Sequence, residues 1–392
     1  MTIDSPADLI SASVSDLCDE ASKLRNRRTG NRITYSPKVF IPLTMLCRDR
    51  CGYCTFAKAP ARIESPFMEI EEILELAQRG SDAGCHEALF TLGEAPEDRY
   101  ELAQRWLQDH GYQSTVEYLV DACAAVVKET GLLPHANAGA LSKAELLALR
   151  EVSASQGMML ESLRGDLDAH RLAPDKTPER RLATLEAAGE LAIPFTTGVL
   201  VGIGENRQDV LDALLAIGQI HERYGHIQEV IVQNFLPKPG TAMAKHPACD
   251  PEEHRWAIAA ARLLLPADIH LQAPPNLTDD VAALISAGID DLGGVSPITA
   301  DHVNPERAWP TLALLADEVS AAGFELAPRM TIYPEFAAQR EQWIAPAMTS
   351  AVLAASDADG LSRDDLWFSG ADCEPPNLLA SHPGGYQSAG SE

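Results

Sequence analysis

The chain has few basic residues for its length. Its 392 residues include 31 Lys and Arg against 57 Asp and Glu, which gives a formal net charge of −26 at pH 7. Because contacts to a nucleic-acid backbone depend mainly on Lys and Arg, this balance argues against a nucleic acid as the partner. One short basic run is interpreted as a solvated helix end; it consists of Lys23, Arg25, Arg27 and Arg28.

The sequence also lacks a long apolar run and a basic leader. No stretch approaches the roughly 20 apolar residues that a membrane-spanning helix needs. Met1–Ile10 carries two aspartates where a signal peptide would be basic. We therefore expect a cytoplasmic protein without a membrane partner. In that reducing compartment the eight cysteines are expected to be ligands or buried thiols and not disulfides.

Most of the cysteines are isolated, and no second C-x2-C pair is present. Those scattered singly are Cys18, Cys85, Cys123, Cys249 and Cys373. Cys85 and Cys123 fall in apolar stretches and are predicted to be buried thiols, and Cys373 an incidental one. A structural zinc site usually has four ligands, often from two such pairs, so the absence of a second pair disfavours zinc.

The remaining three cysteines lie close together on one stretch. Residues 46–56 read L-C-R-D-R-C-G-Y-C-T-F, so that Cys47, Cys51 and Cys54 follow a C-x3-C-x2-C spacing. Three thiolates can hold three irons of a [4Fe–4S] cluster and leave the fourth iron open to a small molecule. The loop resembles that of radical S-adenosylmethionine (SAM) enzymes, in which an aromatic residue, here Tyr53, precedes the last cysteine.

Short apolar segments alternate with longer helical patterns, the order typical of parallel βαβ units. Eight strands are predicted, at Val39–Thr44, Glu87–Leu92, Leu132–Ala136, Gly157–Glu161, Phe195–Val201, Glu229–Phe235, Ile269–Ala273 and Asp291–Val295. This number predicts an α/β fold of the (βα)8 TIM-barrel type. An open doubly wound sheet is the alternative, but its glycine-rich phosphate turn is missing after the first strand.

Several helix starts are readable between these strands. Ser142 and Glu145 have the spacing of a capping box, Thr177 precedes a proline suited to a first helical turn, and Asp250 has the same role before Trp256–Leu265. The predicted domains are a helical N-terminal extension over 1–35, the barrel over 36–349, and an irregular, partly disordered C-terminal tail over 350–392.

In a barrel of this kind, functional groups come from the loops that follow the strands. The resemblance to radical SAM enzymes implies that SAM is bound by residues at several of these strand ends. They are Gly93 and Glu94 after the second strand, Glu161 after the fourth, Arg181 on the next helix, and Gly202 and Gly204 after the fifth, together with Tyr53. Arginine suits the carboxylate of the methionine because its planar fork binds in two places at once.

Longer strings make the resemblance more specific. They are E-A-L-F-T-L-G-E at 87–94, P-F-T-T-G-V-L-V-G-I-G-E at 194–205, Y-G-H-I-Q-E-V-I-V-Q-N-F at 224–235, P-K-P-G-T at 237–241 and G-G-V-S-P-I-T-A-D-H-V-N-P-E at 293–306. With the cysteine loop, these resemble the radical SAM subunit of 7,8-didemethyl-8-hydroxy-5-deazariboflavin (FO) synthase, the subunit that closes the deazaflavin ring. Lys238 in the fourth string is interpreted as a surface residue, with an anion contact as the alternative.

The resemblance implies a lyase of coenzyme F420 biosynthesis. Its substrate would be the tyrosine-derived 4-hydroxybenzyl adduct of 5-amino-6-(D-ribitylamino)uracil, cyclised to FO with release of ammonia. Its partners would be the radical SAM subunit that makes the adduct and a low-potential electron donor of the flavodoxin or ferredoxin type. Alternatives are another radical SAM enzyme of tyrosine, menaquinone or hydrogenase-cofactor chemistry, the adduct-forming subunit itself, or a non-enzymatic zinc-binding scaffold.

A uracil ring and a ribityl chain present many hydrogen-bonding groups, so amides and hydroxyls are expected at the mouth of the barrel. The candidate substrate-binding residues are Asn137, Gln233, Asn234, Gln272, Asn276 and Asp301. His135 or His302 could move the proton needed to release ammonia, because imidazole titrates near neutral pH. The sequence does not choose between the two histidines.

Overall fold

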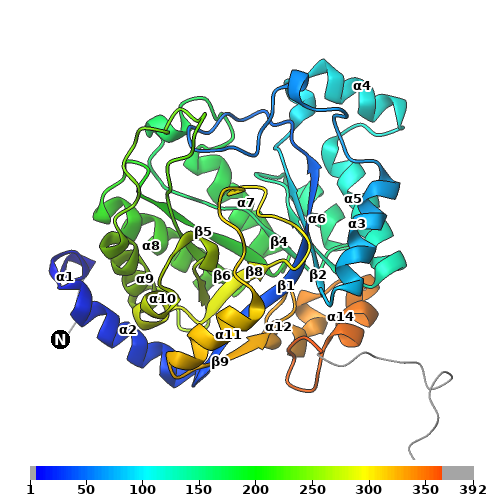
Figure 1. Ribbon diagram of the computed structural model, residues 1–392. Helices are drawn as coiled ribbons and strands as arrows, with labels where there is room; N and C mark the ends of the chain where they lie inside the picture. Colours follow the sequence, from blue (N-terminus) through cyan, green and yellow to red (C-terminus); the bar gives the residue numbers. More distant parts are fainter. Residues whose placement is uncertain (1–5, 364–392) are drawn as a thin grey trace, which may run out of the picture. The chain divides into compact units, whose positions relative to one another are not determined.

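A closed barrel of eight parallel strands forms the centre of this computed structural model, which describes residues 6–363 (Figure 1). Strands β1 to β8 follow one another around the barrel, and β1 closes it by pairing with both β2 and β8. The predicted (βα)8 fold is therefore confirmed. The strands are β1 (Arg32–Thr44), β2 (Glu87–Leu92), β3 (Leu133–Asn137), β4 (Ser155–Gly157), β5 (Phe195–Val201), β6 (Ile227–Asn234), β7 (His270–Gln272), β8 (Asp291–Val295) and β9 (Glu325–Pro328).

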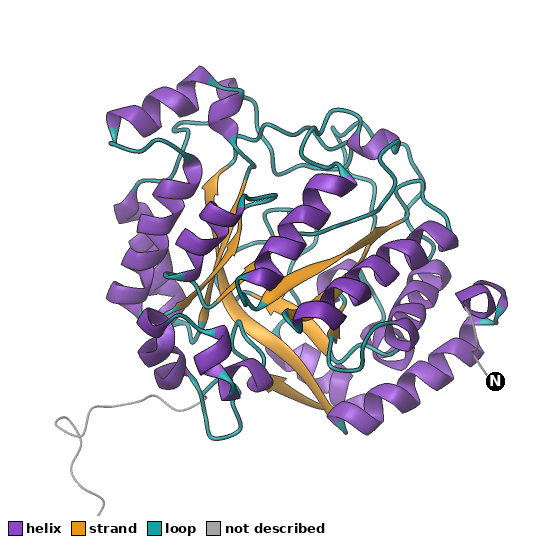
Figure 2. Cartoon of the chain, turned by 180° about the vertical axis from the view of Figure 1, so that it is seen from behind, coloured by secondary structure: helices purple, strands orange, loops and turns teal. Residues whose placement is uncertain are grey.

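Helices connect successive strands and surround the barrel, as the view from behind shows (Figure 2). Two short helices end the described part of the chain after α12. The helices are α1 (Pro6–Ser11), α2 (Val14–Thr29), α3 (Ile70–Asp82), α4 (Glu101–Asp109), α5 (Thr115–Thr130), α6 (Lys143–Arg150), α7 (Pro178–Glu190), α8 (Arg207–Tyr224), α9 (Pro251–Leu264), α10 (Val281–Ala287), α11 (Leu312–Ala321), α12 (Pro334–Ala338), α13 (Arg340–Trp343) and α14 (Thr349–Ala355).

The predicted helix starts agree with the structure. Ser142 and Glu145 form a reciprocal capping box at the start of α6, which satisfies two backbone N–H groups that the helix leaves free. Helix α7 begins at Pro178, directly after Thr177. The Asp250 side chain accepts a hydrogen bond from the backbone of Glu252 at 2.8 Å and caps α9.

The bounds of two strands, β1 and β4, differ from those predicted by more than two residues at one end, and those of β3, β6 and β7 differ by one or two residues. β1 begins at Arg32 and not at Val39, because its first residues pair with β9; β9 itself was not predicted. β4 ends at Gly157 and does not continue to Glu161. Beyond Gly157 the chain leaves the regular ladder, and Glu161 keeps only an isolated bridge to Val199.

The interpretation of the basic run as a solvated helix end is wrong for two of its residues. Arg25 is 1% exposed and lies over the ring of Phe324, 4.2 Å from its centre. Arg28 donates to the carbonyl oxygens of Asp268 and Ile269, each at 2.5 Å. The acceptors of Arg28 lie just before β7, and Arg25 donates to the carbonyl of Ile289, just before β8, at 3.3 Å. Both guanidinium groups attach α2 to the barrel.

The C-terminal part is helical for longer than the predicted tail allows, because α14 extends to Ala355. The remainder of that tail, 364–392, lies outside the described residues, and so does Cys373. No helix in 6–363 is both long enough and apolar enough to cross a membrane.

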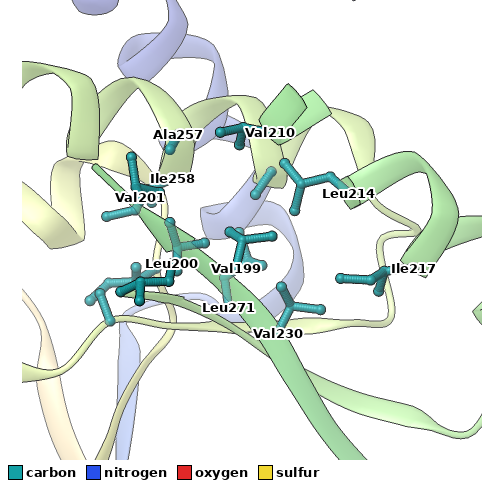
Figure 3. Packing of buried hydrophobic residues seen from close by; sticks show 14 of the residues in the cluster. Val199, Leu200, Val201, Val210, Leu214, Ile217, Val230, Ala257, Ile258 and Leu271 are labelled. Atoms are coloured by element: carbon teal, nitrogen blue, oxygen red, sulfur yellow. The ribbon is translucent and has the colours of Figure 1, made fainter. Parts of the chain in front are cut away.

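Apolar side chains between the strands and the surrounding helices hold the barrel rigid. Val199 of β5 and Val230 of β6 pack with Leu214 and Ile217 of α8 and with Ile258 of α9 (Figure 3). Burial of each large side chain contributes roughly 1.5–3 kcal/mol. This packing fixes the ends of β5 and β6, from which two of the predicted site segments project.

Candidate cluster and substrate site

The cysteine loop follows β1 and runs across one end of the barrel (blue in Figure 1). Backbone hydrogen bonds attach it to two other strand-end loops: Arg48 donates to the carbonyl of Glu94 at 2.8 Å, and Gly52 donates to that of Ala169 at 2.7 Å. Gly93 permits the first contact, since a Cβ at this position would lie 1.9 Å from the carbonyl oxygen of Leu46. The predicted cofactor residue Gly93 thus has a steric role against the loop.

The three predicted metal ligands lie on this loop. They are free thiols, and so are the other four cysteines of the described range. A turn brings Cys51 and Cys54 together, with Cys54 N–H donating to the carbonyl of Cys51 at 3.2 Å. The backbone N–H of Glu94 donates to Sγ of Cys47 at 3.3 Å, and burial raises the pKa of Cys47 to about 12. Three thiols with a sulfur-directed N–H group fit a [4Fe–4S] cluster with one open iron.

Next to the loop, two predicted SAM-binding residues pair in a buried acidic group. Nη2 of Arg181 lies 3.4 Å from Oε2 of Glu94, and oxygens of Asp49, Glu94 and Asp175 lie within 4.8 Å of one another. Burial raises the pKa of Glu94 to about 7, although Arg181 opposes this shift. Within the described structure, Oδ2 of Asp49 and Nε of Arg181 are buried without a hydrogen-bond partner. Such a set could hold the ammonium and carboxylate groups of an amino acid.

A second buried group contains the predicted residues Tyr53 and Glu161. The Glu161 carboxylate accepts hydrogen bonds from the Tyr53 hydroxyl and from Nζ of Lys176, and lies 2.9 Å from Nε2 of His170. Burial alone would raise the pKa of Glu161, but Lys176 and His170 hold it well below its usual range. Glu161 has a φ of 66°, uncommon for a residue other than glycine. Sequence reasoning did not identify His170 or Lys176, which lie in the irregular loop after β4.

Gly202 and Gly204 form the turn that ends β5. The Glu205 carboxylate turns back and accepts from the backbone N–H of Gly202 at 2.5 Å and of Ile203 at 2.8 Å. Gly202 has a φ of 98°, and a Cβ there would also lie 2.8 Å from that of Cys249. The turn therefore requires glycine, and it leaves its backbone close to the mouth of the barrel.

The barrel encloses a cavity that several predicted substrate-binding residues line. Asn137, Gln233 and Gln272 reach it from the ends of β3, β6 and β7, Asp301 from the loop after β8, and His135 from within β3. Phe40 and Trp309 also line the cavity. Their rings are stacked, with 5.3 Å between the ring centres. The cavity thus combines polar groups with a flat apolar wall.

Three other candidates lie outside the lining of this cavity. Asn234 donates to the carbonyl of Leu277 at 3.0 Å, and Asn276 donates to Oδ2 of Asp301 at 3.0 Å. Both amides connect the loops that surround the opening, and His302 does not line the cavity either.

The interpretation of Lys238 as a surface residue is wrong: it is 5% exposed and donates to the carbonyl of Val303 at 2.7 Å.

His135 has the geometry of a neutral hydrogen-bonding group. Its Nδ1 lies 2.7 Å from Oγ of Ser155, the residue beside it in β4. Burial lowers the pKa of His135 to about 4, despite the nearby Glu87 carboxylate. At neutral pH the imidazole therefore carries no charge, and its Nδ1 shares a hydrogen bond with Ser155.

Charged residues at the floor of the cavity were missed by sequence reasoning. Lys38 of β1 and Glu87 of β2 are register partners, and their charged groups lie 2.7 Å apart. Arg329, just after β9, donates to Asp291 at 2.6 and 2.9 Å and to Glu229 at 2.7 Å. The available signal was a charged residue in or next to four of the predicted strands, because charges buried in such positions need partners.

Comparisons with known proteins agree with this architecture. The family model for the radical SAM superfamily matches residues 41–217. The chain is 47% identical over 336 residues to 7,8-didemethyl-8-hydroxy-5-deazariboflavin synthase of Methanopyrus kandleri, covering 84% of this chain and 100% of that protein. It is 46% identical to FO synthase of Nocardia farcinica over 93% of its own length, but spans only 44% of that longer protein.

Two solved structures share the fold. Methylornithine synthase (PylB) matches with a TM-score of 0.65 and 20% identity, over 82% of this chain and 93% of that one. The FeFe-hydrogenase maturase HydG of Carboxydothermus hydrogenoformans matches with a TM-score of 0.64 and 19% identity, over 81% and 72%. The chain belongs to the 7,8-didemethyl-8-hydroxy-5-deazariboflavin synthase family within the radical SAM superfamily, whose enzymes use a [4Fe–4S] cluster and S-adenosylmethionine.

Proposed function

We propose that this chain is the ring-closing lyase of FO formation. It takes the 4-hydroxybenzyl adduct of 5-amino-6-(D-ribitylamino)uracil and cyclises it to 7,8-didemethyl-8-hydroxy-5-deazariboflavin with release of ammonia, in coenzyme F420 biosynthesis. The observation that carries the proposal is the match to the Methanopyrus kandleri synthase over that protein's whole length. The cavity inside the barrel, beside the cysteine loop, supports it.

In this proposal Cys47, Cys51 and Cys54 hold the cluster. When bound, the cluster and SAM supply the radical chemistry that removes a hydrogen atom from the substrate. The carboxylates of Asp49 and Glu94 face the methionine ammonium, and Arg181 faces its carboxylate. These groups are buried near one another, and Oδ2 of Asp49 and Nε of Arg181 have no hydrogen-bond partner within the described structure.

The other predicted SAM-binding residues would hold the adenosyl part. Glu161, fixed by Tyr53, His170 and Lys176, presents a carboxylate suited to ribose hydroxyls. The turn at Gly202 and Gly204 offers backbone without side chains to the adenine ring.

The substrate would lie in the cavity, with its aromatic ring against Phe40 and Trp309. Gln233, Gln272 and Asn137 offer amides to the uracil and ribityl groups. His135 lines the cavity next to the Lys38–Glu87 pair, and this position assigns to it the proton transfer that accompanies the release of ammonia. Lys38 is a cation at the same surface and could protonate the departing amine.

Two other proteins would act together with this chain. The adduct would come from a second radical SAM subunit, and the electron from a flavodoxin or ferredoxin. We also propose a cytoplasmic location, since a reducing compartment keeps the cluster ligands as thiols.

The test is an anaerobic assay of the reconstituted protein with reductant, SAM and the adduct. 5′-Deoxyadenosine and a fluorescent deazaflavin are expected together. Deoxyadenosine without fluorescence would keep the enzyme class and refute the substrate. Neither product, from protein with a full iron complement, would refute the proposal as a whole.

A further inference from the structure

A groove on the outer side of the cysteine loop has a charge opposite to that of the chain. It lies between the cysteine loop and the loop after β4, residues 165–177. Five cationic side chains line it, against two carboxylates, although acidic residues outnumber basic ones by 57 to 31 in the whole chain. The cations are Arg48, Arg50, Arg99, Arg171 and Lys176, and the carboxylates are Asp166 and Asp168.

Two of these cations are exposed and free to meet a partner, whereas Arg99 is only partly exposed and donates to the carbonyl of Arg48 at 2.6 Å. Arg48 pairs with Asp98 and Asp175, and Lys176 with Glu161. Arg50 and Arg171 are exposed, and neither forms an ion pair with any residue of the described structure. Charges that are not neutralised within the chain are those that steer a charged partner.

An exposed leucine joins the two arginines into one surface. Leu172 follows Arg171 directly and is 59% exposed. The backbone N–H of Arg50 donates to the carbonyl of Leu172 at 2.9 Å, which holds the two loops side by side. We call Arg50, Arg171 and Leu172 the basic patch. A large apolar side chain between cations is suited to a protein partner, because burial of its surface adds affinity to the charge attraction.

The basic patch lies directly on the loop that carries the proposed cluster ligands. Arg50 is the residue before Cys51, and Gly52 of the same turn is hydrogen-bonded to the backbone of Ala169. The remaining described cysteines, Cys18, Cys85, Cys123 and Cys249, are scattered singly in the sequence and offer no second cluster site. The basic patch is therefore adjacent in the chain to one of the three proposed cluster ligands.

We propose that the basic patch is the docking surface for the electron donor, a small acidic one-electron carrier protein. This inference rests on the proposed function, which requires reduction of a cluster held by Cys47, Cys51 and Cys54. One electron leaves the carrier, which is oxidised by one unit, and enters the cluster, which is reduced by one. No bond forms or breaks between the two proteins.

The direct test is the binding of an acidic flavodoxin to the cluster-loaded protein. The charge-reversal variant Arg50→Glu/Arg171→Glu is compared with Arg27→Glu/Arg79→Glu, which changes the net charge equally. Arg27 and Arg79 are exposed near the ends of α2 and α3, at the opposite end of the barrel. The milder variant Arg50→Gln/Arg171→Gln is measured alongside, in case the reversal impairs folding.

At low salt we expect the dissociation constant of flavodoxin to rise at least tenfold in the patch variants and less than threefold in the control. In the patch variants, the electron paramagnetic resonance signal of the reduced cluster should appear more slowly than in the wild type when flavodoxin is the reductant. With dithionite as the reductant, it should appear at the wild-type rate. Equal binding by wild-type and patch variants, or no binding by the wild type, would overturn the proposal. The proposal would also be overturned if the patch variants bound flavodoxin normally but no longer bound the adduct-forming subunit. That result would assign the patch to the adduct-forming subunit.

Failure of the proposed function would look different. If flavodoxin binds at the patch and reduces the cluster but no deazaflavin forms from the adduct, the docking surface stands and the substrate assignment falls.

Discussion

The ammonium group of Lys38 lies 2.7 Å from the carboxylate of Glu87, in the wall of the cavity. The two residues are side by side in β1 and β2, so both point into the barrel. The Glu87 side chain is 1% exposed. Burial alone would raise the pKa of Glu87, but Lys38 and its neighbours keep it below its ordinary value. The pair thus keeps a buried carboxylate ionised.

Replacing the cation should therefore destabilise the protein. Lys38→Met leaves the Glu87 carboxylate buried without its ion pair, and breaking such a pair costs roughly 3–5 kcal/mol. We expect a correspondingly lower free energy of unfolding in urea, together with loss of FO formation. The double variant Lys38→Met/Glu87→Gln should recover more than half of the stability but not the activity. A double variant no more stable than the single one would contradict this role.

The pKa of His135 makes stability depend on pH. Burial lowers this pKa from 6.5 to about 4 in the folded protein. Between these values the unfolded chain binds more protons, so the stability contributed by the neutral imidazole is lost as the pH falls. From pH 7 to pH 4 the wild type should lose about 3 kcal/mol more than His135→Asn, which retains a hydrogen-bonding group for Ser155. An equal loss in both proteins, measured by urea unfolding, would show that His135 is not buried in its neutral form.

Each of the three loop cysteines should be needed for the cluster. Cys47→Ala, Cys51→Ala and Cys54→Ala are expected to lack the brown colour and to contain little iron after anaerobic reconstitution. Cys18→Ala is the matched control, because Cys18 is a free, partly exposed thiol on α2. A brown sample with full iron content from all three loop variants would refute the ligand assignment.

Glu161 should affect the affinity for SAM without affecting the cluster. Glu161→Gln removes the negative charge of the carboxylate that Lys176 and His170 contact. We expect the dissociation constant of SAM to rise about tenfold, equivalent to about 1.4 kcal/mol. Tyr53→Phe should have a smaller effect, because it removes only one of the hydrogen bonds to the carboxylate. Glu179→Gln, an exposed carboxylate at the start of α7, is the control. Unchanged SAM binding at normal iron content would remove Glu161 from the site.

The sequence was sufficient where function depends on neighbours along the chain. The cysteine loop is one such segment, and three of the eight barrel strands, β2, β5 and β8, have the bounds that their apolar patterns predict. The floor of the cavity depends on distant partners instead. Arg329 contacts Glu229 across 100 residues and Asp291 across 38, and neither separation follows a helical or strand period.

Loops after the strands were the least predictable part. His170 and Lys176 reach Glu161 only because the chain leaves the ladder after Gly157, which the apolar run through Leu160 concealed. Gly202 was identified through the resemblance to radical SAM enzymes, but the turn in which Glu205 accepts from its backbone is evident only in the structure. Local pattern indicates which strands carry the site, and tertiary packing decides which side chains meet there.

The most direct test of the central claim compares two substrate mixtures with the same reconstituted protein. One contains the hydroxybenzyl adduct and the other contains tyrosine with 5-amino-6-(D-ribitylamino)uracil, both with SAM and dithionite. If the chain is the ring-closing enzyme, deazaflavin fluorescence and 5′-deoxyadenosine appear with the adduct, and no deazaflavin forms from the tyrosine mixture. Deazaflavin from tyrosine without a second protein, or deoxyadenosine without deazaflavin from the adduct, would contradict it.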